Sequence, residues 1–110
     1  MGIPGWGNNE EQYYTASNIT VADGNLVIEA REGDSPDAAY NYTSGRLRSQ
    51  GKVDFTFGRI EASIKVPPGV GLWAAFWLLG TEPGPYGGWA AKGEIDILES
   101  FGGNDPFAQG

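Results

Sequence analysis

The sequence predicts an all-β sandwich, and three observations support this fold class. Short runs rich in aromatic and β-branched residues recur along the 110 residues, and turn-forming residues separate them. Eighteen Gly and seven Pro supply the turns, while four Trp, five Tyr and five Phe argue against a disordered chain. No segment shows the periodicity of an amphipathic helix. This length and pattern suit one domain built from antiparallel strands.

The first half of the chain predicts one clear hairpin. Residues 19–21 form a short apolar run, residues 26–31 predict a strand, and Asp23-Gly24-Asn25 lies between them. Asp-Gly is the strongest short hairpin signal, because the tight turn needs residues that tolerate a positive φ. Residues 32–39 are polar and include a proline, which predicts a loop, whereas residues 40–50 alternate only weakly.

Four further strands are predicted in the second half, over residues 53–57, 59–66, 72–79 and 95–98. The run over 59–66 alternates cleanly between apolar and polar residues, which is typical of a half-buried antiparallel strand. The run over 72–79 is almost continuously apolar, so it is expected to be buried on both faces or to line a cleft. The Pro- and Gly-rich residues 81–88, and residues 102–110, predict loops.

Composition and charge narrow the function. The chain has no Cys and no His, which excludes disulfides, thiolate or histidine metal sites, and Ser-His-Asp or Cys-His catalysis. Carboxylates are then the obvious acid–base groups. A net charge of −7 argues against a nucleic-acid partner and an anionic membrane surface, but is compatible with a neutral sugar. No run approaches the length of a membrane span, and residues 1–5 carry no secretion-signal features.

The most informative segment is a strand that carries three carboxylates. Glu94 and Asp96 are two residues apart and share one face of the predicted strand. Glu99 has the wrong parity in a regular strand, but one extra residue near Ile97 or Leu98 would bring it to the same face. Such a β-bulge is common beside active sites.

The spacing of these carboxylates favours a particular chemistry. With one bulge, Glu94 and Glu99 are about four strand steps apart, or roughly 13 Å between backbones, and their side chains reach towards each other. The carboxyl groups can then approach to about 5–6 Å, close to the ~5–5.5 Å of retaining glycosidases. Asp96 lies between them and can hydrogen-bond either one. The alternatives are a solvent-facing acidic strand edge or a calcium-type oxygen cluster.

Aromatic and basic residues nearby fit a sugar site. Trp73 and Trp77 share one face of the predicted strand over 72–79, and sugars present apolar C–H faces to such rings. Core packing is the alternative for both. For Trp73, the pattern favours neither sugar contact nor core packing. Trp89, in the loop before Glu94, favours substrate contact. Arg46 is either a sugar-hydroxyl contact or part of a solvated strand edge.

These segments together resemble glycoside hydrolase family sixteen, in particular its laminarinase (endo-1,3-β-glucanase) branch. In order and spacing the match is highly specific, and it runs over residues 5–15, 23–30, 42–47, 58–62, 71–80 and 93–99. The resemblance implies a secreted β-jelly-roll with a concave cleft for a β-glucan. It implies Glu94 as nucleophile, Glu99 as general acid/base and Asp96 as assisting carboxylate, with Asn8, Arg46, Trp77 and Trp89 at sugar subsites. It implies no cofactor, apart from room for a structural calcium in the complete domain.

The departures from the family pattern define residues 1–110 as a partial glycoside hydrolase domain. The first strand of the family domain and its later half are not in this sequence. Early and late strands of a jelly roll interleave, so their absence would expose strand edges and core. We therefore expect a complementary fragment, self-association or a larger chain to complete the domain. Mixed-linkage glucan or a galactan as substrate, a glucan-binding module and an inactive fragment remain alternatives.

Overall fold

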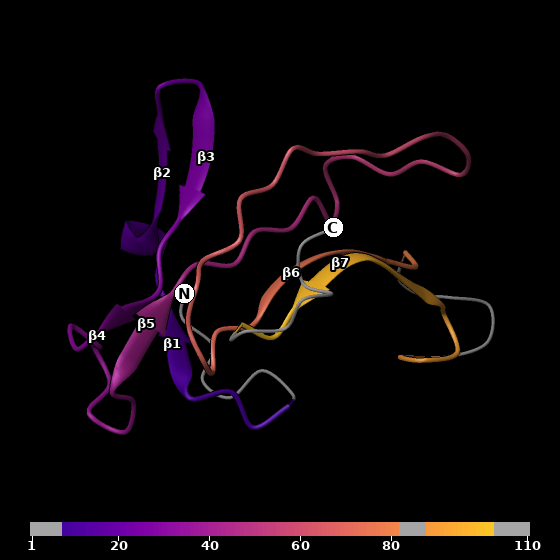
Figure 1. The fold of residues 1–110 in the computed structure, drawn as a ribbon. Helices are drawn as coiled ribbons and strands as arrows, with labels where there is room; N and C mark the ends of the chain where they lie inside the picture. The colour runs from indigo at the N-terminus through magenta and orange to yellow at the C-terminus, as the bar shows by residue number, and fades with distance from the viewer. Residues whose placement is uncertain (1–7, 82–87, 103–110) are drawn as a thin grey trace. The chain divides into compact units, whose positions relative to one another are not determined.

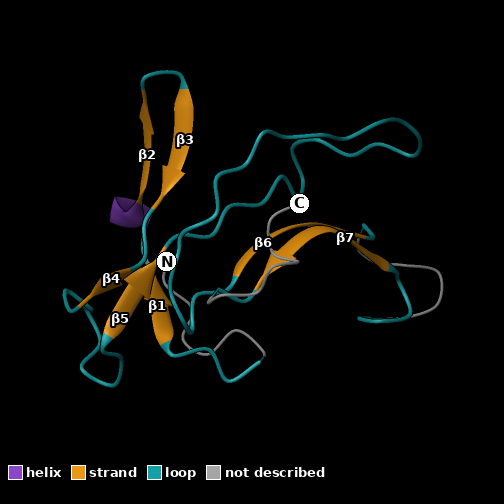
Figure 2. Cartoon of the chain, in the orientation of Figure 1, coloured by secondary structure: helices purple, strands orange, loops and turns teal. Residues whose placement is uncertain are grey.

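The computed structural model describes residues 8–81 and 88–102, and its regular structure is almost entirely β. Seven strands and one short 3-10 turn make up that structure (Figures 1 and 2). The chain forms two compact units, Met1–Ser49 and Gln50–Gly110, each with its own strand pairing. No helix in the described ranges is long and apolar enough to cross a membrane. The all-β class predicted from the sequence is confirmed.

The predicted hairpin is present in the first unit. Strand β2 (Ile19–Ala22) pairs antiparallel with β3 (Asn25–Ile28), and Ala22 faces Asn25 across a two-residue loop. Asp23 and Gly24 in that loop have φ values of 51° and 76°. Positive φ at both central residues is the type I′ turn that matches the twist of the flanking strands. The strand ends at Ile28 rather than at the predicted residue 31.

A three-stranded sheet accompanies this hairpin in the first unit. Its strands are β1 (Gln12–Tyr14), β4 (Arg31–Glu32) and β5 (Tyr42–Ser44). The central strand β5 pairs parallel with β1 and antiparallel with β4. The predicted loop over 32–39 is therefore the connection from β4 towards β5, although its first residue belongs to β4.

A buried polar cluster stabilises the first unit. Asn18 ends the 3-10 turn η1 (Ala16–Asn18) and is 1% exposed. Its Nδ2 donates to the Glu29 carbonyl at 2.9 Å and to Thr43 Oγ1 at 3.1 Å, and its Oδ1 accepts from Thr15 Oγ1. The Glu29 amide in turn donates to the Asn18 carbonyl at 2.9 Å. One amide side chain thus connects the turn to β5 and to the end of β3.

The second unit contains one antiparallel pair, β6 (Ala74–Leu79) and β7 (Glu94–Ser100). At one end of this pair, the Gly80 amide donates to the Gly93 carbonyl at 3.1 Å. A Cβ on Gly80 would lie 2.0 Å from the Lys92 carbonyl oxygen, so only glycine permits this close approach. The predicted loop residues 82–87 and 103–110 lie outside the described residues.

Two of the predicted strands do not form. Residues 53–57 and 59–66 are in neither strand nor helix, and Ile64, on the face of the second segment that was expected to be buried, is 43% exposed. An extended segment becomes a β-strand only when a partner satisfies its backbone groups, and no described strand pairs with either segment. The alternating pattern identified a face suited to burial but could not supply the partner.

Apolar side chains in the described residues remain open to solvent. None of them is buried, whereas the polar side chains of Asn18, Thr43 and Ser100 are. Two alternatives were predicted for residues 72–79. Burial on both faces is wrong for this chain, since Ala75 and Leu79 on β6 are exposed, whereas a position lining a cleft stays a prediction. Two paired strands cannot cover both of their own faces.

Candidate active site

The register between β6 and β7 brings the three carboxylates to one face. Glu94 pairs with Leu79, Asp96 with Trp77 and Glu99 with Ala75. Directly paired residues project to the same side of a sheet, and residues 75, 77 and 79 of β6 share that side. All three acidic side chains of β7 therefore project from one surface.

A β-bulge makes this common face possible. Leu98 pairs with Phe76 and Asp96 pairs with Trp77, so Ile97 is the extra residue on β7. The inserted residue shifts the parity of everything beyond it, which returns Glu99 to the face of Glu94 and Asp96. The bulge predicted near Ile97 or Leu98 is confirmed.

Two indole rings hydrogen-bond the outer carboxylates of this row. Trp89 Nε1 donates to Glu94 Oε2 at 2.6 Å, and Trp73 Nε1 donates to Glu99 Oε1 at 3.1 Å. The Trp73 ring also packs against Phe101, with 4.9 Å between ring centroids. Both rings remain accessible, with Trp89 74% and Trp73 47% exposed. Trp89, predicted to contact the sugar, and Trp73, for which core packing was the alternative, thus lie against the carboxylates themselves.

The arrangement supplies the parts of a carboxylate reaction centre. Each outer glutamate has one oxygen on an indole N–H, which leaves its second oxygen for other chemistry. All three acidic side chains are exposed in this chain, as a substrate would require. Within residues 8–81 and 88–102, no three acidic, His or Cys side chains group closely enough to hold a metal ion.

A family model for glycosyl hydrolases family 16 matches residues 7–109, which is almost the whole chain. The chain belongs to that family. A solved structure of the laminarinase catalytic domain from Thermotoga maritima MSB8 superposes with a TM-score of 0.81 at 48% identity. That similarity covers 90% of this chain and 40% of the laminarinase chain. The family-16 chain therefore has part of the jelly-roll fold of that domain, as the sequence predicted.

Two curated relatives give a similar picture. A β-glucanase of Rhodothermus marinus is 43% identical over 115 residues, covering 100% of this chain and 39% of its own length. A β-1,3-glucan-binding protein of Penaeus monodon is 46% identical over 76 residues, covering 69% of this chain and 20% of its own length. The family-16 chain thus spans well under half the length of these relatives.

The remaining two candidate sugar contacts lie in the first unit. Asn8 is exposed, and Arg46 follows β5 by two residues. Arg46 Nη1 lies 3.9 Å from Glu10 Oε1, and the guanidinium carbon lies 5.8 Å from the centroid of the Tyr14 ring. The proximity of Asn8 and Arg46 to the carboxylates of β7 stays a prediction.

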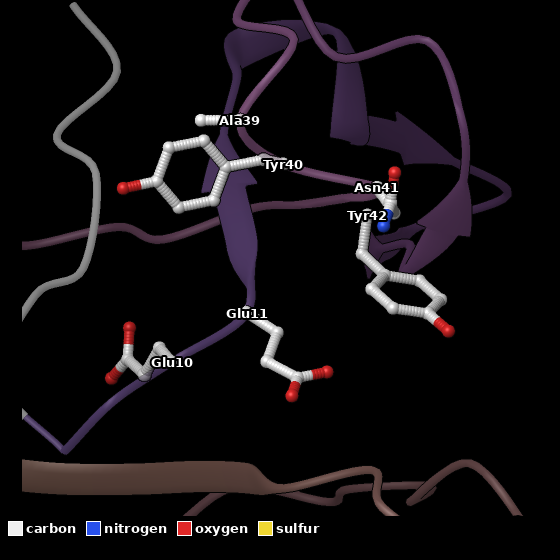
Figure 3. A pocket seen from close by; sticks show the side chains of 6 residues that line it. All are labelled: Glu10, Glu11, Ala39, Tyr40, Asn41 and Tyr42. Atoms are coloured by element: carbon white, nitrogen blue, oxygen red, sulfur yellow. The ribbon is translucent and has the colours of Figure 1, made fainter.

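A hollow of about 420 Å³ opens in the first unit beside Glu10, the residue that faces Arg46 (Figure 3). It is lined by Glu10, Glu11, Ala39, Tyr40, Asn41 and Tyr42. The Tyr40 ring meets Tyr13 edge-on, with 5.9 Å between centroids. None of these six residues was predicted from the sequence to be a site residue. The signal that could have found Glu10 is its position in the matched stretch 5–15, four residues before Tyr14.

Proposed function

We propose that this family-16 chain is the carboxylate-bearing part of a retaining endo-β-1,3-glucanase. The observation that carries the proposal is the common face of Glu94, Asp96 and Glu99, created by the bulge at Ile97. It is supported by the 48% identity to a laminarinase catalytic domain. The proposed substrate is a neutral β-glucan such as laminarin, which suits an acidic chain.

The mechanism assigns one role to each carboxylate. The oxygen of Glu94 that does not accept from Trp89 attacks the anomeric carbon, while Glu99 gives its proton to the departing glycosidic oxygen. This breaks the glycosidic bond and forms a glycosyl ester on Glu94. Glu99 then takes a proton from water, whose oxygen attacks the same carbon and releases Glu94. Asp96 hydrogen-bonds the reacting groups from between them.

The two indoles act on this chemistry as positioning groups. Trp89 holds one oxygen of Glu94 at 2.6 Å, which fixes the orientation of the attacking carboxylate. Trp73 does the same for Glu99 at 3.1 Å. Hydrogen bonds to an ionised carboxylate are stronger than those between neutral groups, so the bond from Trp89 restrains the Glu94 nucleophile effectively. Trp77, opposite Asp96, is proposed as a stacking surface for the sugar, together with Trp89.

The active form requires more β-structure than these residues contain. No described hydrophobic side chain is buried, and Ile95 on β7 is 63% exposed. A complementary part of the family domain, or a second copy of this chain, would cover such faces and exclude water. We refer to these residues joined with the remaining family-16 segments as the completed domain. It is proposed to be secreted and to need no cofactor, with room for a structural calcium.

Hydrolysis of laminarin by the completed domain and by its Glu94→Gln variant tests the proposal. Loss of the nucleophile should lower reducing-sugar release by roughly a thousandfold or more, because the covalent step cannot begin. Glu61→Gln is the matched control, since Glu61 is an exposed acid that forms an ion pair with its near neighbour Arg59. Equal rates for wild type and Glu94→Gln would refute the role of Glu94. A clear preference for agarose or mixed-linkage glucan in a substrate panel would replace the β-1,3-glucan.

Glucan binding without hydrolysis is the second candidate function. It is favoured by the similarity to a β-1,3-glucan-binding protein over 69% of this chain. The three carboxylates on one face favour catalysis instead, since binding alone does not require that set. Laminarin affinity measured by calorimetry in the completed domain, with no sugar released, would establish the binding function.

A further inference from the structure

The end of the β6–β7 pair brings three side chains of the second unit together. Ser100 is the last paired residue of β7 and faces Ala74. One further step along this antiparallel register puts Trp73 opposite Phe101, on the same face as Glu99. The contacts agree with that register, because the centroids of the Trp73 and Phe101 rings lie 4.9 Å apart. Trp73 Nε1 also reaches its diagonal neighbour, Glu99 Oε1, at 3.1 Å.

The backbone fixes Phe101 in this place. On one side of it, Ser100 closes the strand pair and is only 4% exposed. On the other side, Gly102 has a φ of 67°, and a Cβ there would lie 1.9 Å from the Gly69 carbonyl oxygen and 3.0 Å from that of Leu72. Only glycine permits this close approach. The segment that leads into β6 thus packs against the residue after Phe101, and both chain neighbours of Phe101 are held.

The orientation of the Trp73 ring depends on this aromatic partner. Trp73 is 47% exposed, so its surroundings in the second unit cover only part of it. The Phe101 ring packs against it at an angle of 39° between the ring planes. Such aromatic pairs contribute more than the area they bury. Without the Phe101 ring, the indole could adopt other rotamers in which its N–H leaves Glu99.

The hydrogen bond from Trp73 distinguishes the two oxygens of Glu99. The indole N–H can only donate, so it requires a lone pair on Glu99 Oε1. A protonated carboxyl group has a single O–H, and the oxygen that accepts from Trp73 is the less suitable one to carry it. The reacting proton is therefore directed to Oε2, the oxygen left for the sugar.

We propose that Phe101 is a positioning residue for the acid/base step, because it holds the Trp73 N–H on one oxygen of Glu99 and keeps the reacting proton on the other. This rests on the proposed function, in which Glu99 is the general acid/base. When the glycosidic bond breaks, its electron pair stays on the glycosidic oxygen, which takes the proton from Glu99 Oε2. The effect of Phe101 passes through the indole, so it should appear only in steps that need this proton.

A substrate that does not need the proton tests this role. Laminarin requires protonation of the departing oxygen, whereas a dinitrophenyl β-laminaribioside releases a stable phenolate without it. For both substrates, kcat/KM of the completed domain reports formation of the glycosyl ester on Glu94. The ratio of the two values, laminarin over aryl glycoside, is measured on one enzyme sample. A variant that folds only in part lowers both values alike and leaves the ratio unchanged.

The expected changes in this ratio follow from the contacts. Phe101→Leu should lower it about threefold to tenfold, which corresponds to a lost aromatic pair. Trp73→Phe removes the N–H itself and should lower it about tenfold. The double variant should show no further fall beyond Trp73→Phe, because the two residues act through one hydrogen bond. Phe57→Leu, the same substitution at a 93% exposed position of the second unit, is the control and should leave the ratio unchanged.

Three results would overturn the proposal. The ratio could stay unchanged in Phe101→Leu, or both kcat/KM values could fall by the same factor, which would assign Phe101 to folding or sugar binding. Phe101→Leu could also lower the ratio again in the Trp73→Phe background, so that its effect does not pass through the indole. Glu99→Gln keeps these failures apart from failure of the proposed function. That variant should lose laminarin hydrolysis and keep most of its kcat/KM for the aryl glycoside. An equal loss on both substrates would refute the acid/base role of Glu99, whatever Phe101→Leu shows.

Discussion

Both units contain side-chain hydrogen bonds, but the Asn18 side chain of the first unit is buried and the indole–carboxylate pairs of the second are exposed. In the first, the Asn18 amide is 1% exposed and its hydrogen bonds join three segments of backbone and side chain. In the second, the indole–carboxylate pairs of Glu94 and Glu99 lie in the open on a single strand pair. Burial decides the difference, because a buried polar group is costly to leave unpaired whereas an exposed one can exchange its partner.

This contrast assigns a different measurable consequence to each unit. Removing a hydrogen bond in the first unit should lower the free energy of unfolding and leave the chemical step intact. Removing one in the second should alter the reaction and leave stability almost unchanged. A variant that behaved in the opposite way would show that burial does not separate structural from functional groups in this chain.

The largest expected effect on stability comes from Asn18→Ala. The Glu29 carbonyl and Thr43 Oγ1 would lose their donor, and Thr43 is only 2% exposed, so water cannot easily replace it. We expect the free energy of unfolding to fall by about 2–4 kcal/mol. Urea denaturation of the completed domain measures this change. Ser17→Ala, at an exposed position of the same turn, is the control and should change it by under about 0.5 kcal/mol.

Retention of full stability in Asn18→Ala would contradict this view of the first unit. It would mean that the backbone ladders alone hold η1 beside β5. In the folded population of the variant, kcat for laminarin should match wild type, since Asn18 contributes no group to the proposed reaction.

A smaller effect is expected in the second unit from Trp89→Phe. Phenylalanine keeps an aromatic face but lacks the N–H that donates to Glu94 at 2.6 Å. We expect kcat to fall about tenfold, equivalent to one charge-assisted hydrogen bond of ~1.4 kcal/mol, with the unfolding midpoint unchanged. Trp73→Phe makes the same change at Glu99. If Trp89→Phe changes only KM, the ring serves sugar stacking alone and does not position Glu94.

Local patterns predicted those features that depend on neighbouring residues. Asp23-Gly24 determined the hairpin because its turn requires two positive φ values, and both are present. The parity of Glu94, Asp96 and Glu99 required one inserted residue, and the bulge at Ile97 supplies it. Both inferences use geometry within a few residues, where sequence spacing and spatial spacing are closely related.

Features that depend on distant pairing could not be predicted in this way. The parallel ladder between β1 and β5 joins residues 30 apart, for example Tyr13 and Thr43, and no local pattern encodes it. Unless that ladder is known, the sequence does not indicate that Glu10 and Arg46 lie close together. The strand expected over 59–66 failed for the same reason, because its alternation says nothing about whether a partner strand is available.

The smallest expected effect is at Tyr14, which lies between the buried and the exposed extremes. Burial first, and then the Glu10 carboxylate, raises the pKa of Tyr14 in the folded protein. The neutral phenol is therefore favoured by folding, and its contribution is complete below the unfolded pKa of about 10. As the pH rises from there through the higher folded pKa, the unfolded chain releases this proton first and the free energy of unfolding falls.

Tyr14→Phe cannot ionise, so its stability should fall less steeply over the same alkaline range. Urea denaturation of the completed domain at a series of alkaline pH values gives both slopes. Ser17→Ala, which removes an exposed hydroxyl that does not ionise over this range, is the control and should keep the wild-type slope. Identical slopes for Tyr14→Phe and wild type would mean that Tyr14 behaves as a solvated side chain, and the first unit would then have less buried polar structure than its hydrogen bonds indicate.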